Sequence, residues 1–189
     1  GVSGGVSYGA LGSSHHSLHD IATMRTFPGL SVYLPSDRHQ ARQIIRKLFE
    51  DKSPAYVRVG RNAVPDIYTE NDRFEPGMGV LLTEGSDLGI IATGETVFHA
   101  LEAEKELRKS GIKASVLDIH TLKPVDSKSI IELARKTSLI LTVEEHSMFG
   151  GLGSIVAEIL AQHHPVKMKI LGIPDENAIH GKPLEIFAH

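Results

Sequence analysis

Two adjacent histidines, His15 and His16, are the first side chains along this sequence that could do chemistry. They follow the stretch GALGSS and precede SLHDIATMR, whose apolar residues recur with helical spacing. We therefore expect the pair to lie where a loop enters a short helix. Backbone N–H groups at a helix N-terminus attract anions, and imidazoles hydrogen-bond or transfer protons near neutral pH. The pair is a candidate binding or catalytic site; the alternative is that both histidines are merely solvated or capping.

A metal site near the pair is formally possible. His15 and His19 are four residues apart and would share one helix face, with Asp20 adjacent. Zinc and similar ions need three or four protein ligands, and the sequence fixes no third ligand here. We therefore predict no metal site in this chain.

Arg61 is the second candidate, because it follows a short apolar segment that we expect to be a strand from 55 to about 59. A planar guanidinium binds phosphate or carboxylate through two parallel hydrogen bonds. The ends of parallel strands commonly face ligand crevices. Arg61 is thus a candidate anion-binding residue, with a surface salt bridge as the alternative.

The segment TVEEHSMFGGLGS places Glu144, Glu145 and His146 after an apolar run, followed by glycines. It lacks the third glycine of a dinucleotide-binding fingerprint and the Lys-Ser/Thr pair of a P-loop. We therefore favour a structural interpretation. The glycines allow close packing between a strand and a helix, and the acidic and histidine side chains fix the loop or a subunit contact.

The elements that would position these residues begin with a β-α-β unit. We expect a strand at 31–34, a helix over 38–51 opened by a capping Asp37, and the strand at 55–59. The stretch 62–77 has little periodicity and contains Pro65 and Pro76, which indicates a linker. The sequence thus predicts a first domain over 1–64, a linker over 65–77 and a second domain over 78–189.

The second domain alternates between strand and helix patterns. About four parallel strands covered by helices are expected, in a three-layer α/β fold with a mostly parallel sheet. The expected strands are 79–84, 88–94, 113–120, 138–145 and 166–173, and the expected helices are 96–109, 127–136, 152–162 and 183–187.

Composition excludes several classes of protein. The 20 basic and 23 acidic side chains are interspersed and give a formal charge of −3, so no nucleic-acid or membrane partner is expected. The absence of cysteine excludes disulfides and thiolate chemistry and fits a cytoplasmic protein. No apolar run approaches the roughly 20 residues that span a bilayer. The chain begins at Gly1 without methionine, and we expect that upstream sequence is missing.

An ordered series of motifs resembles the C-terminal half of transketolases, best in the split form made of two polypeptides. The series is HHSLHDIATMR, FPGLSVYLPSD, AYVRVGRNAVP, ATGETV, DIHTLKPVD, EEHSMFGGLGS and GIPDENAIHG. The resemblance implies that residues 1–64 are the later part of a pyrimidine-binding domain and that 78–189 are a transketolase C-terminal domain. It also implies that the complete assembly is a dimer that uses thiamine diphosphate and magnesium.

Roles for individual residues also come from the resemblance. His15 matches the family histidine that faces the reacting substrate and cofactor, so it is the expected catalytic residue. His16 and Arg61 match substrate-binding positions, and Arg61 matches the arginine that holds the sugar phosphate. The family's catalytic glutamate, pyrimidine pocket, and magnesium and diphosphate ligands match nothing in this chain, so no cofactor-binding residue is assigned and the chain alone is not expected to bind cofactor.

The sequence departs from the family pattern in the histidine segment. Leu11 and Gly12-Ser13-Ser14 stand where the family often has Asp-Gly-Pro-Thr, whose aspartate contacts a substrate hydroxyl. An earlier family histidine falls near Ser3. The departures indicate that the donor sugar, or its handling, differs from that of ordinary transketolases.

The resemblance implies transfer of a two-carbon ketol unit between sugar phosphates by an assembly that also contains a diphosphate-binding N-terminal subunit or domain. The chain is expected to be inactive alone and to form a homo-oligomer through its C-terminal domain. One alternative is a 1-deoxyxylulose-5-phosphate synthase-like enzyme, which also often has paired histidines. A 2-oxoacid dehydrogenase beta subunit is disfavoured by Arg61 and the EEHS segment. A non-catalytic dimerisation or partner-binding module is the alternative of another class.

Overall fold

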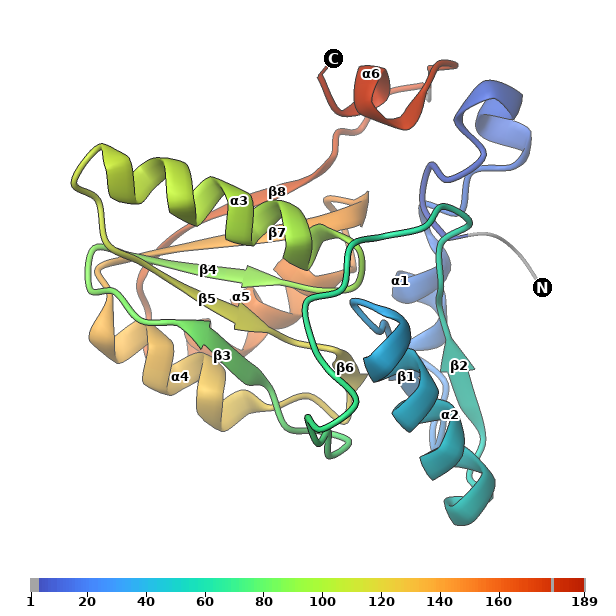
Figure 1. The fold of residues 1–189 in the computed structure, drawn as a ribbon, viewed down its shortest axis with the longest axis horizontal. Coiled ribbons are helices and arrows are strands. Elements are labelled where there is room, and N and C mark those ends of the chain that lie inside the picture. The colour runs from blue at the N-terminus through green and yellow to red at the C-terminus, as the bar shows by residue number, and fades with distance from the viewer. Residues whose placement is uncertain (1–3, 178, 189) are drawn as a thin grey trace.

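The computed structural model describes residues 4–177 and 179–188, which form two β-sheets (Figure 1). The smaller sheet has the strand order β2-β1-β6, and the larger has the order β3-β5-β4-β7-β8. Helices alternate with strands along the chain, which confirms the predicted α/β class. The strands are β1 (Ser31–Tyr33), β2 (Ala55–Val57), β3 (Val80–Thr83), β4 (Leu88–Ala92), β5 (Ala114–Asp118), β6 (Thr121–Lys123), β7 (Leu139–Ser147) and β8 (Lys167–Ile173).

The predicted β-α-β unit is present. Strands β1 and β2 are parallel and are joined by α2 (Arg38–Asp51), whose Asp37 cap accepts the N–H of Gln40 at 2.9 Å. Strand β2 ends at Val57, two residues before the predicted end. The next residue, Arg58, still donates its N–H to the Tyr33 carbonyl of β1 at 2.9 Å, and its side chain is 8% exposed and pairs with Asp20 at 3.0 Å.

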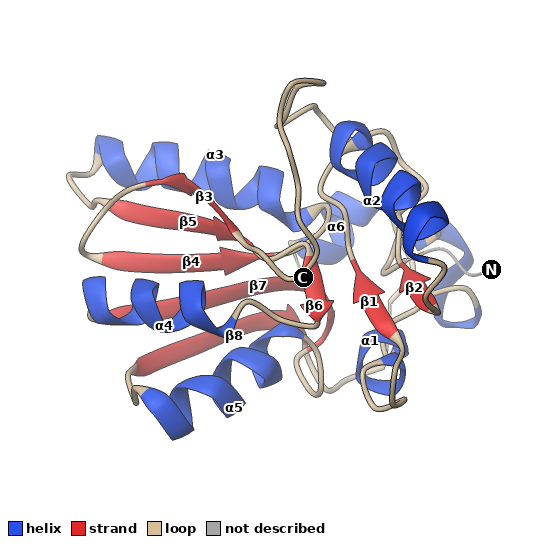
Figure 2. Ribbon diagram, turned by 90° about the horizontal axis from the view of Figure 1, so that it is seen from below, coloured by secondary structure: helices blue, strands red, loops and turns tan. Residues whose placement is uncertain are grey.

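Strand β6 was not predicted from the sequence. It pairs antiparallel with β1, with Val32 opposite Lys123 and Tyr33 opposite Thr121 (Figure 2). Because β6 follows β5 of the larger sheet in the chain, the segment after β5 supplies the third strand of the smaller sheet. The two sheets are therefore tied together by main-chain hydrogen bonds as well as by side-chain packing.

The larger sheet contains four parallel strands, β5, β4, β7 and β8, as expected, and β3 joins its edge antiparallel to β5. Helix α3 (Thr96–Lys109) covers one face of this sheet, and α4 (Ser127–Lys136) and α5 (Leu152–His163) cover the other (Figure 2). The structure therefore has the three layers that the alternating pattern predicts.

The larger hydrophobic core is continuous between the two sheets. Ile21, Val32 and Leu34 from the first part of the chain pack with Leu117 and Ile119 and with the inner faces of α4 and α5. A smaller core lies under α3 around Ile90 and Val97. Burial of shared apolar surface thus fixes the smaller sheet against the larger one.

The irregular connection between β2 and β3 is anchored at Tyr68. The backbone N–H groups of Ile67 and Tyr68 donate to the Asp37 carboxylate at 2.9 and 2.8 Å. The Tyr68 hydroxyl donates to Asp118 at 2.7 Å. The connection is therefore fixed to the N-terminus of α2 and to the end of β5, although its sequence has the composition of a linker.

The C-terminal segment returns to the N-terminal part of the chain. Helix α6 (Pro183–Phe187) lies beside the 3-10 segment η1 (Gly9–Ser14) (Figure 1), and the Gly181 N–H donates to the Gly9 carbonyl at 3.2 Å. Within the described residues, no helix combines the length and apolar character needed to cross a membrane.

Candidate functional site

The two histidines lie on a loop over residues 5–17, which we call the histidine loop. Its ends are joined by an antiparallel bridge between Gly5 and Ser17, and it contains η1. The prediction that the pair lies at a helix N-terminus was wrong. His15 and His16 follow the end of η1, and α1 (Asp20–Met24) begins only at Asp20. The departure from the family pattern at Leu11 to Ser14 lies within η1, where Leu11 is 49% exposed; Ser3 lies outside the described residues.

Tyr8 brings two of the predicted site residues together. Its ring lies 5.5 Å from the His15 ring, and the Arg61 guanidinium lies 4.2 Å from the centroid of the same tyrosine ring. His15 and Arg61 are exposed, and Ser14 hydrogen-bonds the His15 Nδ1 at 2.9 Å. The sequence-based prediction missed Tyr8; its one signal was an aromatic residue within a glycine- and serine-rich loop.

Arg61 is not engaged in the surface salt bridge considered as its alternative. Across 4–177 and 179–188, its guanidinium forms no ion pair within 4.0 Å. Its donors are therefore available to an anion, while cation–π attraction to Tyr8 orients the guanidinium plane. With His15 on the same tyrosine, the surface combines a cationic anchor and an imidazole.

His16 lies apart from this pair and lines a cavity of about 540 Å³. Neither ring nitrogen of His16 has a hydrogen-bond partner of good geometry among the described groups. Burial lowers the pKa of His16; the Gly9 backbone opposes this shift, and the nearby His180 and His15 add to it, so the ring is neutral at pH 7. A neutral imidazole of this kind can donate one hydrogen bond to a ligand and accept another.

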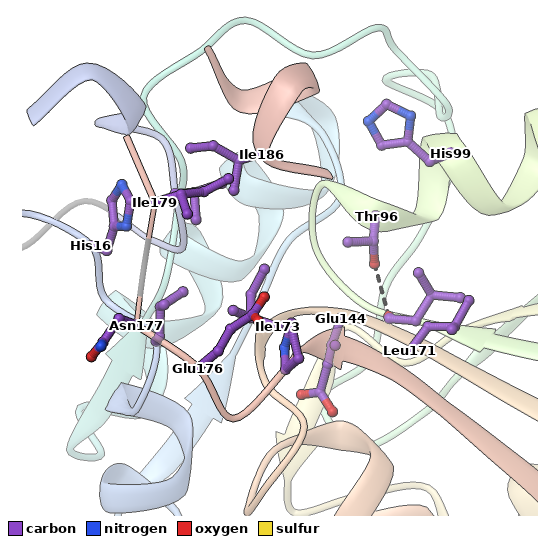
Figure 3. A pocket seen from close by; sticks show the side chains of 15 residues that line it. His16, Thr96, His99, Glu144, Leu171, Ile173, Glu176, Asn177, Ile179 and Ile186 are labelled. Atoms are coloured by element: carbon purple, nitrogen blue, oxygen red, sulfur yellow. Dashed lines mark hydrogen bonds between the residues drawn. The ribbon is translucent and has the colours of Figure 1, made fainter. Parts of the chain in front are cut away.

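The cavity lies between the histidine loop, α3, the ends of β7 and β8, and the C-terminal segment (Figure 3). His16, Ile179 and Ile186 lie on one side, and Thr96, His99 and Leu171 on the other (Figure 3). The C-terminal segment lies directly on the histidine loop, since a Cβ at Gly12 would overlap the ring of His180. Residues from both ends of the chain therefore form this cavity.

The described residues do not fit a bound metal ion. Within this part of the chain, no group of three or more histidine, aspartate or glutamate side chains could hold one. Asp20, considered with His15 and His19 from the sequence, accepts the Tyr56 hydroxyl at 2.6 Å and pairs with Arg58. These residues alone therefore do not form a magnesium site of the kind that thiamine diphosphate enzymes use.

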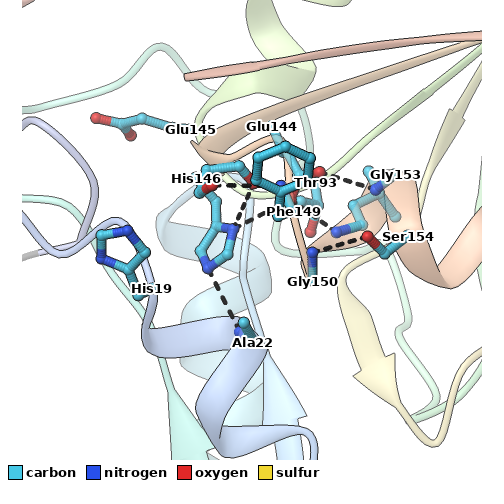
Figure 4. Close-up of polar contacts among 12 residues, drawn as sticks. His19, Ala22, Thr93, Glu144, Glu145, His146, Phe149, Gly150, Gly153 and Ser154 are labelled. Atoms are coloured by element: carbon cyan, nitrogen blue, oxygen red, sulfur yellow. Dashed lines mark hydrogen bonds and ion pairs between the residues drawn. The ribbon is translucent and has the colours of Figure 1, made fainter. Parts of the chain in front are cut away.

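The EEHS segment has a structural role, as its sequence indicated. Glu144 accepts the N–H groups of Leu152 and Gly153 at 2.7 and 2.8 Å and thereby caps α5 (Figure 4). His146 lies 2.8 Å from the Ser147 carbonyl through Nδ1, and its Nε2 accepts the Ala22 N–H at 3.4 Å. Burial lowers the pKa of His146, so it connects β7 to α1 as a neutral ring.

We expect the buried Glu144 carboxylate to make stability depend on pH. Burial raises its pKa from 4.5 to about 7. A carboxyl whose pKa is higher in the folded than in the unfolded state stabilises the folded protein fully at a pH below its pKa in the unfolded chain. This contribution is lost as the pH rises through its pKa in the folded protein. The glutamine of Glu144→Gln stays neutral, so its stability lacks this pH dependence. Between pH 5 and pH 8, the free energy of unfolding of the parent should therefore fall relative to that of the variant by up to about 3 kcal/mol.

Urea unfolding of both proteins at the two pH values measures this shift. Glu102→Gln is the matched control, because that carboxylate is half exposed on α3. An equal difference from the parent at pH 5 and pH 8 for Glu144→Gln would show that folding does not raise the pKa of this carboxyl.

The fold and site define an α/β protein in which a smaller sheet presents a histidine loop and an arginine beside a larger, mainly parallel sheet. Residues 1–66 match the model of the transketolase pyrimidine-binding domain, and residues 77–189 match that of the transketolase C-terminal domain. The chain therefore belongs to the transketolase family, which confirms the resemblance inferred from its motifs.

Named relatives agree with this assignment. The chain is 57% identical over 191 residues to one of the apulose-4-phosphate transketolase subunits of Phocaeicola vulgatus, covering 100% of this chain and 61% of that protein. It is 38% identical over 176 residues to 1-deoxy-D-xylulose-5-phosphate synthase 1 of Geobacter sulfurreducens, covering 91% of this chain and 28% of that protein. The chain thus spans less than two thirds of the length of either relative.

A solved structure of a split-gene transketolase, described as an inactive β4 tetramer, is 41% identical with a TM-score of 0.85. The match covers 92% of this chain and 56% of that one. The arrangement of both sheets is therefore that of a split transketolase subunit.

Proposed function

We propose that this chain is the C-terminal portion of a split transketolase and that the complete assembly transfers a two-carbon ketol unit between sugar phosphates. The observation that carries the proposal is the grouping of His15 and Arg61 around Tyr8. It places an imidazole and an unpaired guanidinium on one surface, which suits a substrate with hydroxyl groups near one end and a phosphate at the other.

In this proposal, His15 transfers protons and binds substrate hydroxyls at the reacting end of the sugar. Arg61 anchors the phosphate, because its exposed donors match phosphate oxygens. His16 donates and accepts hydrogen bonds with a further substrate hydroxyl from the cavity side. Together these contacts would orient the sugar relative to the reacting carbon, which is a large part of catalysis in a group transfer.

The partner and cofactor follow from family membership. We propose a diphosphate-binding N-terminal subunit or domain as the partner, an oligomer with a dimeric core formed through the C-terminal domain, and a cytoplasmic location. Thiamine diphosphate and magnesium would bind in the complete assembly, with their ligands supplied outside this chain. In the proposed division of the chain, the two domains span 1–64 and 78–189 and the linker spans 65–77.

The experiment uses the complete subunit, mixed with its candidate diphosphate-binding partner. Thiamine diphosphate binding is measured by calorimetry for the subunit alone and for the mixture, with and without magnesium. Ketol transfer is then measured with ketose phosphate donors, and apulose 4-phosphate is tested first because of the Phocaeicola vulgatus relative. Absence of binding and transfer in the mixture would leave a folded module without this chemistry.

The second candidate is a 1-deoxyxylulose-5-phosphate synthase-like reaction, favoured by the 38% identical relative from Geobacter sulfurreducens. The same mixture separates the two reactions. Condensation of pyruvate with glyceraldehyde phosphate would support the synthase, whereas transfer from a ketose phosphate without pyruvate would support the transketolase.

A further inference from the structure

The position of the histidine loop depends on how its two ends are held. Gly5 and Ser17 exchange backbone hydrogen bonds at 3.2 and 3.0 Å, so the loop between them closes on itself. Tyr8, His15 and His16 all lie within the closed part. We call the paired Gly5 and Ser17 the base of the loop. Any group that holds the base of the loop therefore also holds the side chains that surround the proposed substrate.

Glu145 holds the first end of the loop from β7. Its Oε1 accepts the Val6 N–H at 2.7 Å across 139 residues of sequence. Gly5 has φ of 58°, and a Cβ at that position would overlap the Glu145 carboxyl group. Figure 4 shows Glu145 directed away from the α5 N-terminus that Glu144 caps. The two adjacent glutamates thus serve different parts of the molecule.

Arg58 holds the second end. Its Nη2 donates to the Ser17 carbonyl at 3.2 Å and to the Glu145 carbonyl at 2.6 Å. Its Nε lies 3.0 Å from the Asp20 carboxylate, and both side chains are 7% exposed. One buried guanidinium therefore connects the base of the loop, the end of β7 and the start of α1.

We propose that Glu145 is a positioning residue for the proposed transfer reaction, which it serves by holding the base of the histidine loop, with Arg58 holding the opposite end. The inference rests on the proposed function. Glu145 acts through Val6 and Gly5, since its carboxylate lies beneath the loop and contacts its backbone. A displacement of about 1 Å in such a loop can lower the rate of a group transfer by about 100-fold.

The chemistry of the contact suggests the variants to compare. Burial raises the pKa of Glu145 to about 7, Arg58 opposes that shift, and Glu95 and Asp20 add to it. A backbone N–H requires an acceptor but not a charge, so a glutamine oxygen can replace the carboxylate. Glu145→Gln should therefore preserve the loop, and Glu145→Ala should release it.

The test measures ketol transfer by the complete assembly with saturating partner, thiamine diphosphate and magnesium. Glu145→Ala is expected to lower kcat about 10-fold to 100-fold, with a smaller rise in the KM for the sugar phosphate, and Glu145→Gln is expected to restore kcat to within about threefold. Asp126→Ala is the matched control, because Asp126 accepts the backbone N–H of the distant Gly79 at 2.8 Å and lies away from the loop. It should lower the urea midpoint and leave kcat unchanged.

Gly5→Ala approaches the same contact from the loop side and carries the test if Glu145→Ala does not fold. Its methyl group overlaps the Glu145 carboxyl and its φ of 58° strains an alanine, so it should also lower kcat; where Glu145→Ala folds, the double variant should cost less than the sum of the two single effects. Unchanged kcat in Gly5→Ala or in folded Glu145→Ala would overturn the inference while leaving the proposed function intact. A parent assembly that transfers no ketol unit would instead remove the proposed function.

Discussion

Replacing His15 with alanine in the complete assembly is expected to lower kcat by about 100-fold to 10,000-fold, the range for loss of one proton-transferring side chain. His15 is exposed and is held by Ser14 on one side and Tyr8 on the other. Its removal takes away a group that acts on the substrate but leaves the folded loop intact. We therefore expect the unfolding midpoint to change little, since the exposed ring buries little apolar surface.

The measurement is steady-state ketol transfer with a coupled assay for the aldose phosphate product, at several pH values. His164→Ala is the control, because His164 is a partly exposed histidine at the end of α5. Equal kcat for the parent and His15→Ala would assign the proton transfer to another group.

Replacing Arg61 with alanine should raise the KM for phosphorylated sugars about 10-fold to 100-fold, because a hydrogen bond to a charged group contributes about 1.5–3 kcal/mol. The KM for an unphosphorylated analogue should change little, since no anion is present to be bound. Arg61→Lys should recover part of the loss, because an ammonium supplies charge without the paired donors of a guanidinium.

The comparison of phosphorylated and unphosphorylated substrates distinguishes anchoring of the phosphate from a general effect on the loop. Arg73→Ala is the control, since Arg73 is an exposed arginine whose guanidinium donates to the Glu70 carbonyl at 3.4 Å. A uniform rise in KM for both classes of substrate would mean that Arg61 supports Tyr8 instead of binding phosphate.

Local sequence predicted most of the helices. Four helices have the bounds that were expected from the sequence: α2 over 38–51, α3 over 96–109, α4 over 127–136 and α6 over 183–187. Helix periodicity, with the cap at Asp37 for α2, is encoded by neighbouring residues. Strand β6 was missed because its three residues become a strand only through pairing with β1, about 90 residues earlier in the chain. That pairing has no signature in local sequence.

The site residues could be predicted from their own motifs, but the contacts between segments far apart in the sequence could not. The resemblance of motifs selected His15, His16 and Arg61, and the structure joins the first and last of these through Tyr8. The separate orientation of His16 and the contact of Glu145 with the loop depend on segments far apart in the sequence. Such contacts follow from packing of the two sheets and not from any pattern within one segment.

The pairing of β6 with β1 has a consequence for biosynthesis. As the chain leaves the ribosome, β1 and β2 emerge well before residues 121–123, so the edge of β1 that pairs with β6 stays open until those residues have been made. An open strand edge can pair with another chain, and incompletely folded intermediates aggregate through such edges. The order of synthesis therefore exposes the smaller sheet to misassembly until β6 pairs with β1.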